Sequence, residues 1–238
     1  MPAVAGPPYE TDDPEPTAFR HYEIYVFTSY DSDASHAINA SLPSVELNYG
    51  LMPNVQFSVT APFAAAQSAA APFHAGFGDA EVALKVRFMQ ERPGRPQASF
   101  YPALVLPTGN AALGLGGGAP KVFLPIWLQK TNGAWTYFGG GGIWRNPGPG
   151  NRDYTFTGFA ATHDVREGFN LGAEVYHRSP DTIGGTASTG VGVGFTADRG
   201  QNHALLASFG RDVAGPGTFH AYAAYELYLG PAADGKKR

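Results

Sequence analysis

The sequence of 238 residues contains no cysteine, which excludes disulfide bonds, thiolate metal sites and a cysteine nucleophile. Charged residues make up only 15% of the chain, well below the roughly one quarter found in soluble proteins. The net charge of −4 and the lack of a basic stripe argue against nucleic acid as a partner. No run of about 18 apolar residues occurs, so the sequence predicts no membrane-spanning helix.

The first residues, Met1–Gly6, do not show a charged segment followed by an apolar one. We expect that a signal peptide has been removed from an exported protein and that Met1 is not native. The mean hydropathy of −0.19 is that of a soluble chain, but the alternating strands of a membrane barrel escape this measure.

The stretch 78–88 shows the period of a β-strand most clearly. Its apolar residues alternate with polar ones: Ala80, Val82, Leu84, Val86 and Phe88 against Asp79, Glu81, Lys85 and Arg87. Charges buried without partners cost several kcal/mol, so the polar face must meet water. The apolar face then covers either a soluble core or lipid with a wet lumen behind it.

Similar segments continue along the chain. We predict twelve strands at about 18–30, 36–50, 55–61, 78–88, 97–107, 121–130, 134–144, 153–163, 169–178, 188–197, 203–211 and 218–229. Short turns near 51–54, 91–96, 131–133, 164–168 and 198–202 alternate with longer loops at 31–35, 64–76, 108–120, 145–152, 179–187 and 212–217. This pattern predicts an all-β fold: a transmembrane antiparallel up-and-down β-barrel with both termini on the short-turn rim.

The predicted organisation is a single barrel over residues 18–229 between two tails. Residues 1–17 form an extended arm rich in proline and acid, and residues 230–238 form a polar C-terminal tail. Asp12, Asp13 and Glu15 could bind a divalent cation, but calcium sites need about six oxygens from a shaped loop. We therefore expect a solvated acidic arm.

Aromatic residues cluster toward strand ends, where a membrane barrel carries its interfacial girdles. They are Phe19, Tyr22, Tyr30, Tyr49, Phe63, Phe88, Trp135, Trp144, Tyr154 and Phe169. Gly139–Gly142 lie inside a predicted strand, where glycine permits close approach or sharp bending of the barrel wall.

No motif for catalysis or cofactor binding is present. The glycine-rich loop at 114–118 lacks the lysine and the following helix of a phosphate loop. No two histidines have the spacing of a metalloprotease site. His177 and Ser179 lie close in the sequence, but strand alternation and the following Pro180 do not hold them in a working nucleophile–base pair. We expect no enzymatic activity, no metal and no cofactor.

Inward-pointing polar side chains are the better functional candidates. The predicted pore-lining residues are Glu23, Glu46, Asn48, Asp79, Glu81, Lys85, Arg87, Lys121, Glu174, Tyr176, Tyr222 and Glu226. Mixed charge in a confined pore sets solute preference, whereas the same charges could also form a structural ladder that plugs a narrow barrel. Both interpretations remain open. In the first, Lys85 and Arg87 form a cationic wall that faces Glu23 and Glu226.

Several motifs resemble the bacterial outer-membrane β-barrel family described as transporters of the meta-pathway of phenol degradation. They are Pro8–Pro14, Glu46–Gly50, Gly78-Asp79 with Lys85, Leu106–Gly109, Gly139–Gly142, Asn146–Asn151 and Gly172–Glu174. The resemblance covers nearly all of the chain after the arm and implies an outer-membrane location and a role in uptake. The chain departs from this class of barrel at its end, where a polar tail replaces the usual terminal aromatic residue.

We therefore expect an outer-membrane channel or transporter that passes small solutes, aromatic or amphipathic ones included. Its partners would be the solute and outer-membrane lipid or lipopolysaccharide. Two alternatives remain: a non-transporting envelope barrel with a plugged lumen, and a soluble ligand-binding barrel of the lipocalin type.

Overall fold

The computed structural model describes residues 8–69 and 71–231, which form one antiparallel sheet. Its strands are β1 (Tyr22–Ser32), β2 (Ile38–Met52), β3 (Val55–Ser68), β4 (Ala71–Phe77), β5 (Ala80–Met89), β6 (Gln97–Phe100), β7 (Ala103–Leu106), β8 (Lys121–Asn132), β9 (Trp135–Arg145), β10 (Tyr154–Arg166), β11 (Phe169–Arg178), β12 (Ser188–Asp198), β13 (His203–Ala214) and β14 (Phe219–Leu229). One 3₁₀ turn, η1, spans Ala111–Leu113. Among the described residues, no helix is long and apolar enough to cross a membrane.

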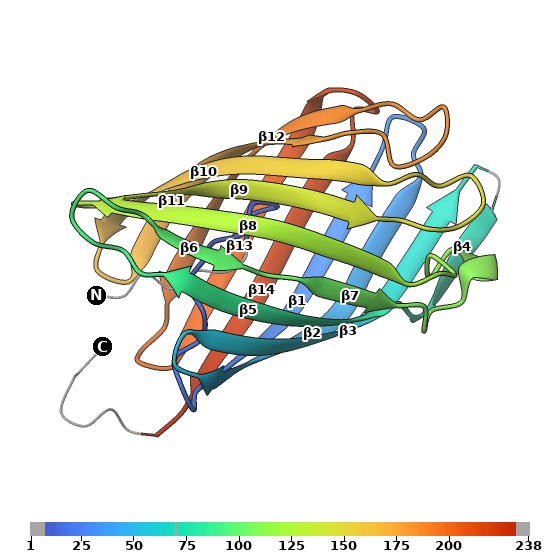
Figure 1. The fold of residues 1–238 in the computed structure, drawn as a ribbon. Helices are drawn as coiled ribbons and strands as arrows, with labels where there is room; N and C mark the ends of the chain where they lie inside the picture. The colour runs from blue at the N-terminus through green and yellow to red at the C-terminus, as the bar shows by residue number, and fades with distance from the viewer. Residues whose placement is uncertain (1–7, 70, 232–238) are drawn as a thin grey trace.

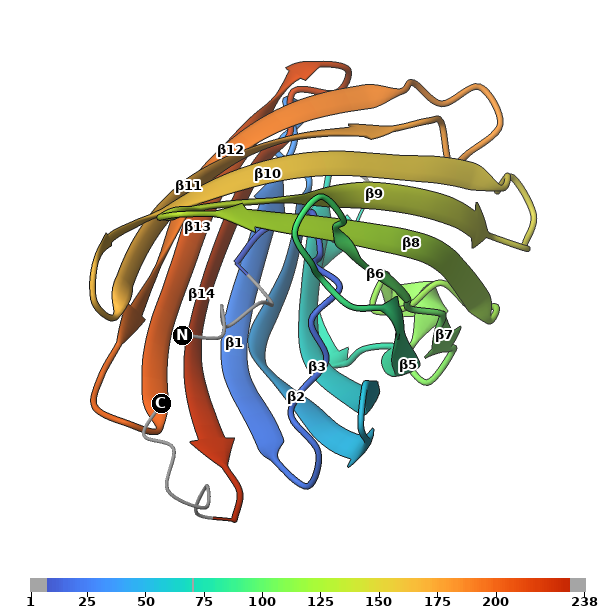
Figure 2. The same ribbon diagram turned by 60° about the vertical axis from the view of Figure 1, so that its left-hand side comes forward.

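The sheet closes on itself because β14 pairs with β1 along its whole length. Two of the strand positions around the barrel are each filled by two shorter strands in succession. Both β4 and β5 pair with β3, on either side of Gly78 and Asp79. Both β6 and β7 link β5 to β8, on either side of Tyr101 and Pro102. The result is a closed antiparallel barrel of twelve strands, as predicted (Figures 1 and 2).

Connections at the two ends of the barrel differ in length. Tight connections join β2 to β3, β8 to β9 and β10 to β11 at one end, while loops of 14 and 9 residues follow β7 and β11 at the other. One predicted loop is wrong. Residues 64–76 continue β3 and return as β4 in a hairpin, because small residues such as Ala64, Ala65 and Gly76 let the pairing extend.

The two faces of the wall follow the predicted alternation. On β5, Leu84 and Phe88 are 37% and 60% exposed on the outside, whereas Ala83 and Lys85 are 5% and 3% exposed. On β8, Leu124, Ile126 and Leu128 lie outside, and Trp127 and Gln129 are buried inside. A wall that is apolar outside and polar inside fits lipid around it and water within it.

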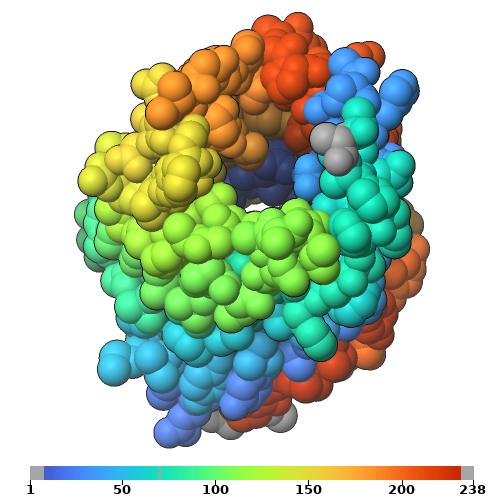
Figure 3. Space-filling view, turned by 90° about the vertical axis from the view of Figure 1, so that its right-hand side faces the viewer, coloured from blue at the N-terminus to red at the C-terminus, as the bar shows by residue number. Residues whose placement is uncertain are grey.

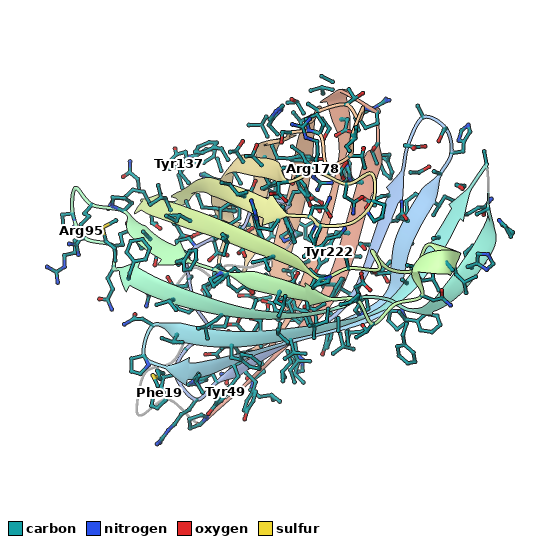
Figure 4. All side chains as sticks on the ribbon, turned by 45° about the vertical axis from the view of Figure 1, so that its right-hand side comes forward. Phe19, Tyr49, Arg95, Tyr137, Arg178 and Tyr222 are labelled. Atoms are coloured by element: carbon teal, nitrogen blue, oxygen red, sulfur yellow. The ribbon has the colours of Figure 1, made fainter. Side chains whose placement is uncertain are left out.

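Some of the outer aromatic residues lie near the ends of the barrel, whereas Phe159 and Phe209 lie in the middle of their strands. Figure 4 shows Phe19 and Tyr49 on the outer surface at the short-turn end, with Tyr137 also outside. Two predicted girdle residues are placed otherwise. Trp144 and Tyr154 point inward, where Trp144 stacks on Phe123 with ring centroids 4.6 Å apart.

Gly139–Gly142 on β9 allow a very close approach of the neighbouring strands, as predicted. A Cβ at any of the four would lie 2.0–2.6 Å from a carbonyl oxygen of β8 or β10. Gly140 and Gly141 also have φ values of 155° and 157°, at the edge of the range that side chains rarely adopt. Only glycine fits where the neighbouring strands approach this closely.

Candidate functional site: the lumen and the N-terminal arm

The N-terminal arm, residues 8–18, crosses the lumen instead of extending into solvent. Thr11, Asp13 and Thr17 are only 2%, 1% and 2% exposed. Figure 2 shows the dark blue trace of the arm running inside the ring of strands, and Figure 3 shows dark blue atoms at the bottom of the hollow mouth. The expectation of a solvated acidic arm is therefore wrong, because wall residues distant in the sequence provide partners for its carboxylates.

Residues 1–7 of the predicted arm and residues 232–238, which make up most of the predicted C-terminal tail, lie outside the described residues.

The first part of the arm packs against a closely fitting surface of β10 and β11, formed by Gly158, Gly172 and Glu174 and called the seat below. A Cβ at Gly158 would lie 2.2 Å from Thr11 Oγ1, and a Cβ at Gly172 would lie 2.4 Å from Tyr9 Oη. Any larger residue at these two positions would collide with the arm in its observed place. Glu174 of β11 accepts hydrogen bonds from the backbone N–H groups of Glu10 and Thr11, both at 3.0 Å, and from Thr11 Oγ1 at 2.9 Å. Glu174 was predicted to line the pore; it holds the arm.

Ion pairs fasten the acidic part of the arm to the opposite wall. Lys85 Nζ lies 3.1 Å from Asp12 Oδ1 and 3.9 Å from Asp13 Oδ1, and Arg87 Nη1 donates to Glu15 Oε1 at 2.5 Å. Burial raises the pKa of the Asp13 carboxyl, and the Lys85 ammonium opposes that shift. The cations therefore pair with the arm, whereas the sequence suggested Glu23 and Glu226 as their counterparts.

Wall residues orient Arg87 independently of the arm. Asn54 Oδ1 accepts from Arg87 Nε at 3.1 Å and from Nη2 at 2.8 Å, and Gln97 Oε1 accepts from Nη1 at 2.9 Å. The Lys85 ammonium lies 4.6 Å from the ring centroid of Tyr101. The cationic site is thus built into β5 and its neighbours.

Three of the predicted carboxylates lie in one hydrogen-bonded row of the wall. The strand register places Glu226, Tyr25, Glu46, Thr60 and Glu81 in one row across β14, β1, β2, β3 and β5. One level closer to the short turns, Glu23 accepts from Thr17 Oγ1 of the arm at 2.9 Å. Asn48 donates to Glu46 and accepts from Gln56.

Asp79 serves the loop between β7 and β8. Its two carboxylate oxygens accept the N–H groups of Gly109 at 2.9 Å and Gly117 at 2.7 Å. These bonds hold the loop next to β4, where Leu115 of the loop is only 6% exposed. Leu115 packs against Gly76 of β4 so closely that a Cβ at Gly76 would lie 3.2 Å from Leu115 Cδ1. The loop therefore narrows the long-loop mouth of the barrel.

A cavity of about 370 Å³ lies between this loop and the wall. It is lined by small and polar residues of β1, β2 and β3, with Lys121 of β8 at its edge. Asp31, another lining residue, is 2.8 Å from His220 Nδ1, and His220 Nε2 lies 3.7 Å from Asp212. The cavity is thus polar where it meets β1, β2 and β3, and Figure 3 shows a hollow at this end of the barrel.

An inward aromatic cluster occupies the wall formed by β8 to β11. Of its members, only Tyr176 was predicted from the sequence to line the pore. Trp127, Phe156 and Tyr176 are buried together, with Phe123 and Trp144 packed against them. Phe156 and Tyr176 stack at 6.1 Å, and Trp144 and Tyr154 stack at 5.8 Å. The alternation along β8, β9 and β10 could have revealed the cluster. Phe123, Trp144 and Tyr154 all fall on the inward-facing positions of their strands, and Trp144 pairs with both of the others across the sheet.

The remaining candidates also lie inside the barrel. Figure 4 shows Tyr222 in the interior. It also shows Arg178 there, which was not among the predicted residues and whose Nη2 lies 3.6 Å from Glu10 Oε2 of the arm. The structure gives His177 and Ser179 different partners, Thr189 and Thr155. Among the described residues, no group of three or more acidic or histidine side chains could hold a metal ion.

A family model described as "Putative MetA-pathway of phenol degradation" matches residues 28–225. The chain belongs to this family. Curated protein sequences give no match.

The solved structures share the barrel fold. An outer-membrane channel from Pseudomonas putida F1 aligns with a TM-score of 0.77 at 18% identity, covering 93% of this chain and 100% of that one. The NanC porin aligns at 0.61 and 7% identity, covering 87% and 100%. The KdgM porin in complex with disordered oligogalacturonate aligns at 0.59 and 7% identity, covering 86% and 98%.

Proposed function

We propose that this protein is a channel of the bacterial outer membrane that passes small solutes. The observation that carries the proposal is the wall of the closed barrel, which is apolar outside and lined with charges inside. Such a wall suits lipid on its outer face and a wet pathway within. The likeness to outer-membrane channels and porins supports this proposal, and so does membership of the family.

Aromatic or amphipathic solutes are the class that we propose for the pathway. The aromatic cluster offers Trp144 and Tyr154, both partly exposed and stacked toward the long-loop mouth. Flat aromatic surfaces favour rings by stacking, worth about 0.5–1.5 kcal/mol per pair. Asp31 of β1 and Lys121 of β8, which line the cavity at this end of the barrel, offer charged groups to the polar part of such a solute.

A plugged barrel is the second candidate function, because the arm crosses the lumen and is fastened at both walls. In that case the protein would be a structural or binding component of the envelope. In either case, outer-membrane lipid or lipopolysaccharide would surround the barrel, and the native chain would carry a signal peptide that is later removed.

Liposome swelling tests the channel and its solute class together. We expect purified protein in liposomes to admit phenylalanine faster than leucine, which is of similar size but lacks the ring. Trp144→Ala with Tyr154→Ala should remove this preference while leaving the entry of serine unchanged. No swelling with any solute would favour the plugged barrel, and an unchanged preference in the variant would remove the aromatic cluster from the pathway.

A further inference from the structure

We propose that the N-terminal arm, through Asp12, Asp13 and Glu15, is the element that sets the ion selectivity of the pore. The inference rests on the proposed channel function. In a barrel of this kind, selectivity is usually sought in the wall, and the wall here does carry a cationic site, Lys85 and Arg87. The arm occupies that site with carboxylates from another part of the chain.

The charges around Lys85 and Arg87 decide whether the pore prefers cations or anions. The arm brings three carboxylates within 4 Å of two cations. Asp12 and Glu15 alone cancel the two positive charges, and Asp13, whose pKa is raised by burial, adds negative charge when it is ionised. Glu23, Glu46 and Glu81 lie on the wall around the same level and add negative charge. Charged groups in a confined lumen attract counter-ions, so the seated arm makes the constriction selective for cations.

The arm holds these carboxylates in fixed positions rather than as a loose tail. Glu174 anchors its backbone on β11, the cations anchor its side chains on β5, and Thr17 donates from its backbone N–H to Gln56 of β3 at 2.7 Å. Asp13 Oδ1 also accepts from the N–H of Glu15 at 2.6 Å, which fixes the turn that presents the acids. Fixed charges select ions more sharply than mobile ones, because they need no reorganisation.

The decisive variant neutralises the three acids: Asp12→Asn with Asp13→Asn and Glu15→Gln. In a planar bilayer under a potassium chloride gradient, we expect the potassium-to-chloride permeability ratio to fall by about threefold or more, toward anions, because Lys85 and Arg87 lose their counter-charges. Lys85→Gln with Arg87→Gln should shift the ratio in the opposite direction. Glu167→Gln is the matched control, since it removes one carboxylate from an exposed turn.

A disulfide separates the charge effect from loss of the seat. The chain has no cysteine, and a Cβ at Gly158 would lie 3.1 Å from Thr11 Cβ, below the Cβ–Cβ range of about 3.5–4.5 Å in disulfides, so a small outward shift of the arm would bring the pair into bonding range. Thr11→Cys with Gly158→Cys should therefore cross-link the arm to β10. We expect the neutralised arm to shift the ratio toward anions even when it is cross-linked.

An unchanged permeability ratio in the neutralised variant, with intact conductance, would overturn the proposal and return selectivity to the wall. Should the triple variant fail to fold, Glu15→Gln alone provides the same test on a residue at the edge of the seat, with a smaller shift in the same direction. A wild type that inserts but never conducts would instead overturn the channel function itself.

Discussion

At the scale of single residues, the alternation along β5 determines what each side chain meets. Leu84 is 37% exposed on the outer face, and its neighbour Ala83 is 5% exposed on the inner face. Lys85 follows Ala83 inward and finds its partners in the arm, 72 and 73 residues away in the sequence. A shift of one position along such a strand exchanges lipid for lumen.

Leu84→Arg tests this assignment of faces. We expect it to cost about 2–4 kcal/mol of the free energy of unfolding from lipid vesicles, because a charge near the bilayer midplane is poorly solvated. Ala83→Arg should cost less, since its guanidinium would enter a lumen that contains Glu81 and Glu46. Both changes are measured by urea titration of each variant in vesicles, with the folded fraction read from its heat-modifiable gel mobility. Equal costs, or the reverse order, would contradict the assignment.

At the scale of elements, the loop between β7 and β8 owes its inward position to Asp79. Two hydrogen bonds from backbone N–H groups to this carboxylate should each contribute about 1.5–3 kcal/mol to holding the loop in place. Asp79→Ala should therefore release the loop from the mouth. We expect faster amide exchange at Gly117 and faster proteolysis within 107–120.

The control for that variant is Asp164→Ala, an exposed carboxylate at the other end of the barrel. It should leave both measurements unchanged. Protection at Gly117 that persists in Asp79→Ala would mean that packing of Leu115, rather than the carboxylate, holds the loop.

The elements also show how far the sequence predicts the structure. Alternation with period two predicted the antiparallel barrel of twelve strands, because this period is a local property of each strand. The place of the arm is not local. Its acids are equally compatible with solvent, and its seat is built from Gly158, Gly172 and Glu174, which meet only after β10 and β11 pair in the closed barrel. Trp144 and Tyr154 were misplaced because aromatic residues at strand ends favour both girdles and lumen clusters.

At the scale of the whole molecule, the barrel exposes large apolar side chains around its outer face, among them Ile126, Phe159 and Phe209 at 50%, 51% and 61%. A soluble protein rarely exposes so much contiguous apolar surface. We expect the folded protein to remain monodisperse in detergent or lipid and to aggregate when detergent is removed. A folded monomer in plain buffer, measured by light scattering, would favour the soluble ligand-binding barrel.

The single measurement closest to the central claim is the current through the wild-type protein in a planar bilayer. Protein shown to be folded by its heat-modifiable mobility should insert in discrete steps of conductance, with a reversal potential that indicates cation preference. Folded protein that inserts without conductance would contradict the account of an open pathway past the arm, and conductance with anion preference would contradict its account of the charges in the lumen.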